Sequence, residues 1–353
     1  MVSIRILNRL LKRGALLTTL FVILFNECLI YSITPAWWNS LKCYSDNCTR
    51  ILFVADPQLL GFENENKFYS SLARKDSDRY LKKTFDKAVK FTNPDIICFL
   101  GDLLDEGNIA SPYHFKIYVD RFQTTFSTQI NPRRIHVPGD NDIGGENGEY
   151  ISNSNIRRFE IEFMHEDLFD FDNRMRFFKI NRMLMDFSNP DPMNNYDRIR
   201  IGVTHMPLLM SGGPLMRNVL NDLDPHVIFS AHWHESRIFL FPSSSSQELY
   251  TNKVLEYDLI KLKDDHEYLE IMIPTASYRM GKMKIGYGSA IFDNNVLRYT
   301  VLWNFSRFIS LLIYLLWVAT IAILCLIFIV IWRCPIRLGK RKNINNNSYI
   351  PQL

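Results

Sequence analysis

The chain has 353 residues, 47% of them hydrophobic and 22% charged, which is enough apolar material for one large domain or two ordinary ones and argues against intrinsic disorder. Its net charge of +4 comes from 41 basic and 37 acidic residues, but nine of the basic ones flank two apolar runs at the ends. Setting aside those nine and Glu27, which lies within the first run, leaves 32 basic and 36 acidic residues, so the middle of the chain carries about −4. A nucleic-acid-binding core is disfavoured because no basic stripe remains there.

The first predicted element is an apolar segment over residues 15–33, which follows a basic start of the chain. Asn26 and Glu27 interrupt it, and an ionised carboxylate in lipid costs about 3 kcal/mol unless it is paired or lies near an interface. A cleaved signal peptide would also have a basic start and an apolar centre. No small-residue cleavage site follows near residues 32–36, so a retained transmembrane helix is favoured.

Residues 34–50 form a neck between this segment and the first predicted strand. Cys43 and Cys48 lie in the neck, where either a disulfide or a pair of free thiols is compatible with the sequence. Asn47 and Asn304 each begin a glycosylation sequon, which is used only in secretory compartments.

The next part of the chain alternates between short apolar strands and amphipathic helices. Strands are predicted at residues 51–55, 95–100 and 134–137, with helices over 78–92 and 113–126 between them. Each strand is followed within a few residues by an aspartate. The alternation predicts an α/β sheet with a site along the edge where the carboxyl ends of its strands lie.

Further strands are predicted in the second half, at residues 177–187, 199–204, 227–230, 253–262, 268–273 and 296–303. The last element is a charge-free apolar run over 308–332, long enough to cross a bilayer. Because basic clusters lie outside both apolar runs, the positive-inside rule places both termini in the cytosol and residues 34–307 across the membrane. The predicted organisation is a cytosolic basic tail (1–14), a transmembrane helix (15–33), a lumenal neck (34–50), a lumenal domain (51–307), a transmembrane helix (308–332) and a cytosolic tail (333–353).

Carboxylate and imidazole side chains follow five of the predicted strands. Taken singly each is a weak signal, because a Gly-Asp turn or a histidine at the end of a strand is common. Their joint order is informative: an acid after the first strand, Gly-Asp after the second, Gly-Asp-Asn-Asp after the third, a single histidine, and then His-x-His. Carboxylate and imidazole together suit divalent transition ions such as Mn, Fe or Zn, so the sequence predicts a metal site.

This order resembles the calcineurin-like metallophosphoesterase superfamily, whose blocks are D-x-H, G-D-x-x-D, G-N-H-D, a lone H and G-H-x-H. Within it, the strings Gly-Asp-Leu-Leu-Asp-Glu-Gly and Gly-Asp-Asn-Asp-Ile-Gly-Gly look most like the metallophosphoesterase 1 branch. The resemblance implies a sandwich of two mixed β-sheets flanked by helices. It also implies two divalent ions, manganese by family expectation with Zn or Fe as alternatives. The implied ligands are Asp56, Gln58, Asp102 and His234 for one ion, and Asp102, Asp140, His205 and His232 for the other.

Three positions depart from the family pattern. Gln58 replaces a histidine but retains an oxygen ligand, and Asp140 replaces an asparagine and adds charge. Asn141 stands where the family has the histidine that assists the leaving group, and such help is worth about 10²–10⁴ in rate. Asp142, His136 and His165 are candidates to take over that role, and the sequence does not choose among them.

The resemblance further implies a function in the early secretory pathway, between ER exit sites and the Golgi. Members of this branch remove ethanolamine phosphate from the GPI-anchor glycan, at its second mannose. The expected partners are GPI-anchored proteins as substrates, membrane lipid and possible cargo receptors, with no nucleic acid. The alternative is a catalytically weak, metal-binding relative that recognises cargo or glycan, and Asn141 is the feature that favours it.

Overall fold

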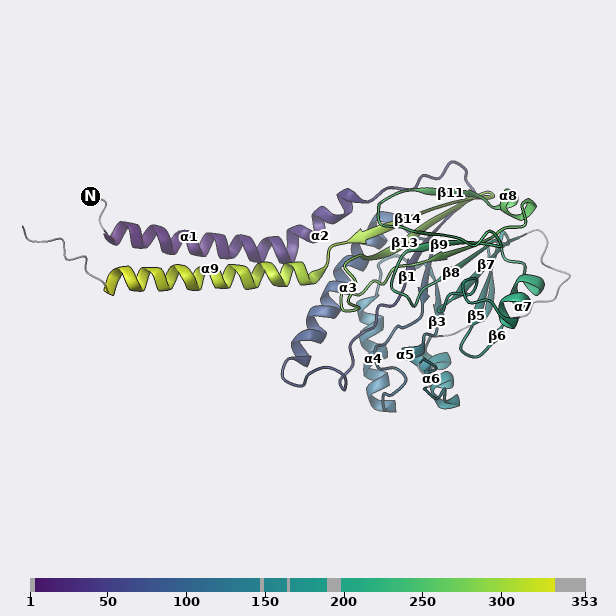
Figure 1. Ribbon diagram of the computed structural model, residues 1–353, viewed down its shortest axis with the longest axis horizontal. Helices are drawn as coiled ribbons and strands as arrows, with labels where there is room; N and C mark the ends of the chain where they lie inside the picture. The colour runs from purple at the N-terminus through teal and green to yellow at the C-terminus, as the bar shows by residue number, and fades with distance from the viewer. Residues whose placement is uncertain (1–3, 147–148, 164–165, 189–197, 334–353) are drawn as a thin grey trace, which may run out of the picture. The chain divides into compact units, whose positions relative to one another are not determined.

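The computed structural model describes residues 4–146, 149–163, 166–188 and 198–333. The part from Phe25 to Ile309 forms one compact unit, and the terminal segments form a second. The first unit contains two mixed sheets, as the family resemblance predicts (Figure 1).

The first sheet has six strands, in the order β11 (Leu255–Asp258), β14 (Val296–Asn304), β13 (Ile285–Asp293), β1 (Cys48–Val54), β2 (Ile96–Leu100) and β3 (Arg133–Val137). The second follows the order β10 (Ser245–Glu248), β9 (Arg237–Phe241), β12 (Tyr268–Met272), β8 (Val227–Ser230), β7 (Ile199–Thr204), β5 (Met175–Asn181) and β4 (Leu168–Phe171), with β6 (Asp186–Phe187) paired to β5. In each sheet the strands that carry the candidate ligands are parallel: β1–β2–β3 in the first and β7–β8 in the second.

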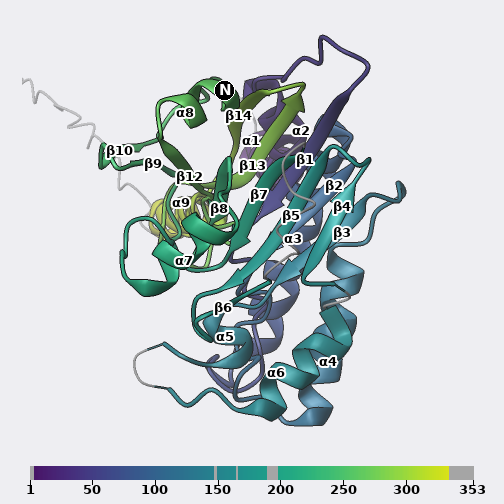
Figure 2. The same ribbon diagram turned by 90° about the vertical axis from the view of Figure 1, so that its right-hand side faces the viewer.

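Alternation along the strands divides the core into layers. Phe53 of β1 and Phe229 of β8 point between the sheets, where their rings stack 4.1 Å apart. Leu52 and Phe99 point to the opposite face of the first sheet, against α3 (Ser70–Thr92), α4 (Pro112–Thr125) and α6 (Asn153–Phe163), which lie together on that side (Figure 2). The second sheet is covered by α7 (Pro214–Asp222). Two short helices, α5 (Asp140–Ile143) and α8 (Leu259–Asp264), complete the unit.

Two predicted strands are wrong in extent. The expected strand 177–187 is interrupted by a turn between β5 and β6, and the expected strand 253–262 ends at Asp258, where α8 begins. The Asp258 side chain accepts hydrogen bonds from the backbone of Ile260 and Lys261, so it caps the helix and stops the strand. Residues 237–241, 245–248 and 285–293 also form strands that the hydrophobic pattern did not indicate.

The two terminal helices are long and apolar enough to cross a membrane: Arg9–Trp37 and Arg307–Val330. The first consists of α1 (Ile4–Leu24), a π-helical turn (Phe25–Leu29), α2 (Ile30–Ile33) and a 3₁₀ turn (Thr34–Trp37), and the second is α9 (Arg307–Arg333). Trp317 donates a hydrogen bond from Nε1 to Thr19 at 3.1 Å. The predicted C-terminal cytosolic tail, residues 333–353, lies outside the described residues apart from Arg333.

The end of the first apolar segment is folded into the domain. Tyr31 and Trp38 are 4% and 6% exposed, and the Trp38 indole donates to the carbonyl of Trp303 at 2.7 Å. Glu27 forms ion pairs with Arg79 at 2.6 Å and with Arg307 at 2.7 Å. The carboxylate that interrupts the apolar run is therefore paired with cations of the domain and does not face lipid alone.

His226 gives the domain a predicted sensitivity to acid. Burial, together with the positive charges of Arg200 and Lys263, lowers the pKa of His226 to about 4, and its Nδ1 accepts a hydrogen bond from the Arg200 backbone. Between pH 4 and 6.5 the unfolded chain binds the extra proton, so the free energy of unfolding falls as pH drops through this window. We expect His226→Asn to remove on the order of 2 kcal/mol of that fall.

Urea unfolding of the detergent-solubilised full chain at several pH values measures this effect. The same substitution at the exposed His266 serves as the control. Equal slopes for the His226→Asn variant and the unaltered protein between pH 4 and 6.5 would contradict the assignment.

Candidate metal centre

The strand ends of the two sheets bring the candidate ligands to one place. Asp56 follows β1, Asp102 follows β2 and Asp140 begins α5 after β3, while His205 follows β7 and His232 follows β8. Because all five strands are parallel within their sheets, their carboxyl ends meet at the same edge. The structure therefore brings these five predicted ligands together at that edge, in two candidate metal-binding groups.

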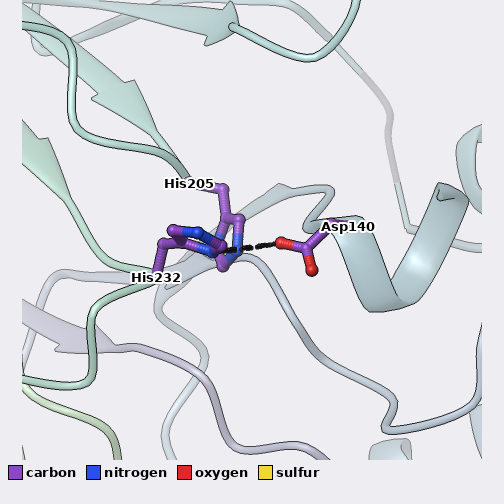
Figure 3. Close-up of side chains that lie close together, drawn as sticks. All are labelled: Asp140, His205 and His232. Atoms are coloured by element: carbon purple, nitrogen blue, oxygen red, sulfur yellow. Dashed lines mark hydrogen bonds and ion pairs between the residues drawn. The ribbon is translucent and has the colours of Figure 1, made fainter. Parts of the chain in front are cut away.

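Three of these side chains present donor atoms to one another at nearly equal distances. Oδ1 of Asp140 lies 3.0 Å from Nε2 of His205 and 3.1 Å from Nδ1 of His232, and the two ring nitrogens are 3.2 Å apart (Figure 3). The Nδ1 atom of His205 faces the carbonyl of Leu100 at 2.8 Å, so it carries the proton and leaves the Nε2 lone pair facing the cluster. Spacings of about 3 Å are those of neighbouring ligands around one cation.

The other predicted ligands adjoin this triad. Asp56, Asp102 and His205 form a second group whose donor atoms lie within 4.8 Å of one another. Nε2 of His234 is 4.0 Å from Oδ1 of Asp56, and the Gln58 amide nitrogen is 2.9 Å from Asp102 and 3.4 Å from His234. All seven predicted ligands are thus in one cluster. A ligand role for Gln58 requires its carbonyl oxygen in that place, which a half-turn of the amide supplies.

The backbone at this edge is unusually constrained. Five of the seven candidate ligands have positive φ, between 41° and 72°: Asp56, Gln58, Asp102, His232 and His234. Such conformations cost about 1–3 kcal/mol each and gather at functional sites. The glycines before Asp102 and Asp140 have a steric reason: a Cβ on Gly139 would lie 2.1 Å from Oδ1 of Asp102, and one on Gly101 would lie 2.4 Å from Nδ1 of His205.

Buried carboxylates hold the ligand loops by accepting backbone N–H groups. Asp142 accepts from Leu103, Leu104 and Gly139 at 2.9–3.1 Å, which ties the loops after β2 and β3 together. Glu270 accepts from Leu208 and Leu209 just after His205, and Glu106 accepts from residues 62–64 after Gln58. The positioning roles of Glu106 and Glu270 were missed by sequence reasoning, because no short motif links them to the loops they hold.

The electrostatics of the cluster fit divalent cations. Burial raises the pKa values of Asp56 and Asp102, and Oδ2 of Asp56 is buried without a hydrogen-bond partner among the described residues. Burial would lower the pKa of His205, but the charges of Asp102, Asp140 and Asp56 outweigh it and raise that pKa to about 10. The cluster therefore attracts positive charge. Burial and the neighbouring histidines lower the pKa of His234 to about 4, which keeps its ring neutral as a ligand must be.

The structure shows the surroundings of Asn141 and of two residues considered as substitutes for the family's histidine. Asn141 donates from its backbone N–H and from Nδ2 to the two oxygens of Asp102, at 3.0 and 2.9 Å, so it orients a candidate bridging ligand. Asp142 is fully buried by its loop contacts, and His136 stacks on Phe99 at 5.0 Å in the helix layer. Both oxygens of Asp142 accept backbone N–H groups, so its carboxylate is engaged in holding the loops. His165 lies outside the described residues.

Glu146 stands beside the cluster and was not singled out from the sequence. Its Oε1 lies 4.0 Å from Nε2 of His232, the ring nitrogen that faces away from Asp140. Burial and the charge of Asp140 raise the pKa of Glu146. A carboxylate on the outer nitrogen of a metal-binding histidine is a common device for fixing its tautomer. Glu146 is therefore a candidate positioning residue for His232, four residues beyond Asp142 in the same loop.

Replacement of Glu146 by glutamine is predicted to weaken metal binding. The variant loses the charge that orients His232, and loss of such partners typically lowers metal affinity about 10–100-fold. The measurement is metal content per chain during titration with a chelator. Glu149→Gln is the matched control, because Glu149 lies in the same loop and contacts Asn108 rather than a ligand. An unchanged affinity in Glu146→Gln would show that His232 needs no such partner.

The comparisons with known proteins agree with this geometry. The family model described as calcineurin-like phosphoesterase matches residues 49–236, more than half of the chain. The chain is 30% identical over 187 residues to Metallophosphoesterase 1 of Ailuropoda melanoleuca, covering 50% of this chain and 44% of that protein. It is 29% identical over 134 residues to a Metallophosphoesterase 1 homolog of Drosophila melanogaster, covering 35% of each. The chain thus spans less than half the length of these relatives.

A solved structure, the purple acid phosphatase PPD1 from yellow lupin seeds, is similar over 74% of this chain and 53% of that one, with 11% identity and a TM-score of 0.43. The family match includes the strands that carry Asp56, Asp102, Asp140, His205 and His232. Those residues form the candidate metal groups of the structure. The chain therefore belongs to the calcineurin-like phosphoesterase family.

Proposed function

We propose that this protein is a membrane-anchored lumenal phosphodiesterase that removes ethanolamine phosphate from the second mannose of the GPI-anchor glycan. The observation that carries the catalytic part is the convergence of three carboxylates and three histidines at one sheet edge, with donor atoms of the Asp140 triad 3.0–3.2 Å apart. The relatives named Metallophosphoesterase 1 support the branch. The resemblance of the motif strings supports the substrate.

In the proposed reaction, some residues would bind the metal ions and others position those ligands. Two divalent ions, manganese by family expectation, would supply Lewis acidity that activates water and neutralises phosphoryl charge. Asp56, Gln58, Asp102 and His234 would hold one ion, and Asp102, Asp140, His205 and His232 the other. Asn141 holds Asp102 in place, and Asp142 fixes the loops. His232 and His234 are the least buried of the histidine ligands, at 18% and 22%, so we expect substrate to approach from their side.

The proposed topology has residues 34–307 in the lumen, transmembrane helices at 15–33 and 308–332, and tails in the cytosol, in membranes between ER exit sites and the Golgi. The Cys43–Cys48 disulfide supports an oxidising compartment and answers the open question of pairing in the neck. The packing of Glu27 and Tyr31 into the domain supports retention of the first helix, because signal cleavage would remove both. An N-terminal epitope that stays on the mature protein tests retention, and its loss would favour a signal peptide.

The catalytic proposal is tested with the purified full chain in detergent, loaded with manganese, and a GPI glycan that carries ethanolamine phosphate. We expect release of ethanolamine phosphate in a single turnover, accompanied by bound metal. Expected partners in the cell are GPI-anchored proteins, membrane lipid and cargo receptors.

A second function is favoured by Asn141. Its side-chain amide is bonded to Asp102 and has no acidic proton for a leaving group, unlike the histidine of the family pattern. A metal-binding but catalytically weak protein would recognise GPI glycan or cargo without cleaving it. Metal bound at full stoichiometry with no turnover of any phosphodiester would establish this alternative.

A further inference from the structure

The start of α3 exposes a cluster of apolar side chains. Phe68 is 97% exposed, Leu72 is 72% exposed and Tyr69 is 49% exposed, within five residues of one another. The loop that carries Phe68 lies at the periphery of the domain (Figure 1). Lys67 and Lys75, both exposed, flank the cluster. Aromatic and aliphatic side chains beside lysines are typical of segments that lie in a membrane interface.

The face of α3 that carries Leu72 also contacts the two places where the chain enters the apolar helices, Glu27–Tyr31 and Arg307, which we call the helix roots. Leu72, Asp76, Arg79 and Lys83 follow one another at steps of four, three and four residues, so they share one helix face. Their partners belong to the two chain segments that enter the apolar helices. Asp76 pairs with Arg307 at 2.7 Å, Arg79 pairs with Glu27 at 2.6 Å, and the Lys83 ammonium lies 4.6 Å from the centre of the Tyr31 ring.

If both apolar helices span a membrane as proposed, these contacts lie where the chain enters it. Arg307 is the last charged residue before the apolar run of α9, and Glu27 is the only charged residue of the first apolar segment. Glu27, Asp76 and Arg307 form a paired ion network there, which suits the boundary between lipid and water because paired charges tolerate a nearby apolar medium. Leu72 is one helical turn, about 6 Å, from Asp76 along the same face, and Phe68 lies in the turn before it.

We propose that Phe68, Tyr69 and Leu72 form a lipid-docking cluster that rests in the interface of the bilayer in which the chain is anchored. The bilayer is the chosen occupant because the cluster continues the face that contacts both helix roots and because its lysines complement phosphate head groups. The inference rests on the proposed spanning of the membrane by both apolar helices.

The docking cluster also connects to the metal centre. Arg74, between Leu72 and Asp76, donates to the carbonyl of Gly61 at 3.2 Å and lies 4.5 Å from the centre of the Phe62 ring. That loop follows directly from Gln58, and its backbone is held by Glu106. Arg74 therefore links the helix that carries the cluster to the loop that follows Gln58. The substrate class that fits this arrangement is a phosphodiester carried on a membrane lipid.

Photocrosslinking of the full chain in nanodiscs of phosphatidylcholine and phosphatidylserine tests the docking. A benzoylphenylalanine at position 68 or 72 is expected to form adducts with lipid, while the same probe at Ile161 of α6, which is 69% exposed, is expected to form none. Adducts with a protein, or lipid adducts no more frequent at 68 than at 161, would overturn the proposal. This readout needs no catalytic turnover, so it is independent of the proposed reaction.

A kinetic comparison supplies the second measurement. Phe68→Asp combined with Leu72→Asp is expected to raise KM at least about 10-fold for a GPI lipid held in the nanodisc, because the apolar anchor is lost. Hydrolysis of soluble bis(p-nitrophenyl) phosphate is expected to be unchanged. Ile161→Asp is the matched control. Equal KM values for the lipid substrate would contradict docking, whereas a protein that cleaves neither substrate would contradict the proposed function and leave the crosslinking result to decide.

Discussion

Asp102→Asn is expected to abolish phosphodiester hydrolysis while leaving the domain folded. Asp102 is the carboxylate assigned to both ions, and it is 2% exposed, so no water replaces its charge. Loss of one preorganised electrostatic group typically costs about 10²–10³ in kcat, and a shared ligand should cost at least that. The remaining oxygen can still accept from the Asn141 side chain, and one negative charge leaves a site that holds three.

Single-turnover hydrolysis and metal content per chain measure this loss, and urea unfolding checks the fold. The matched control is Asp105→Asn, three residues along the same loop. Asp105 belongs to neither candidate metal group, and burial together with the charge of Glu106 raises its pKa to about 7. Retained activity and metal in Asp102→Asn would contradict the dimetal assignment, whereas equal losses in both variants would indicate a disturbed loop rather than a lost ligand.

Gly139→Ala is expected to destroy the metal centre by steric force alone. The added Cβ would lie 2.2 Å from the backbone nitrogen of Asp102 and 2.1 Å from its Oδ1. A contact with backbone cannot be relieved by a change of rotamer, so the loops after β2 and β3 must separate. Separation also breaks the hydrogen bonds that Asp142 makes to both loops. We expect loss of metal binding and a destabilisation of about 3 kcal/mol.

Gly212→Ala is the control for this variant. Gly212 has φ of 62° and no atom within 4 Å of an added Cβ, so its substitution carries backbone strain of about 1–2 kcal/mol without a clash. Metal content and the midpoint of urea unfolding are measured for both. A Gly139→Ala protein that binds metal as the unaltered chain does would show that the two loops are not packed as the structure has them.

The sequence predicted the sheet strands best where burial is continuous. The strands at 51–55, 95–100 and 134–137 are confirmed within a few residues, because runs such as Ile96–Leu100 are buried on both faces and need no partner to be recognised. The prediction failed at residues 253–262, where the side chain of Asp258 ends the strand and starts a helix. It also missed β13, although all nine of its residues are buried, because four glycine and small residues weaken its apolar pattern.

The members of the candidate site were predicted from the order of the acidic and histidine motifs along the chain. The distances between them could not be predicted from that order. Asp56, Asp102, Asp140, His205 and His232 each follow a strand, and that local fact is visible in the chain. Glu106 and Glu270 hold ligand loops by hydrogen bonds, and Glu146 lies 4.0 Å from His232, yet nothing in their neighbourhood identifies them. Their roles depend on which loops lie opposite, and a single sequence carries no measure of that distance.

By itself the sequence determined the two apolar helices, the parallel β-α units, and the chemical types of the ligands, since hydrophobic period and residue chemistry act over a few neighbouring positions. Only the tertiary structure decided that Glu27 pairs with Arg79 and Arg307, that Asn141 orients Asp102, and that Asp142 joins two loops. The physical reason is that charge pairing and close steric contact fall off within a few ångströms. They depend on how strands far apart in the chain stack into sheets, which no local pattern specifies.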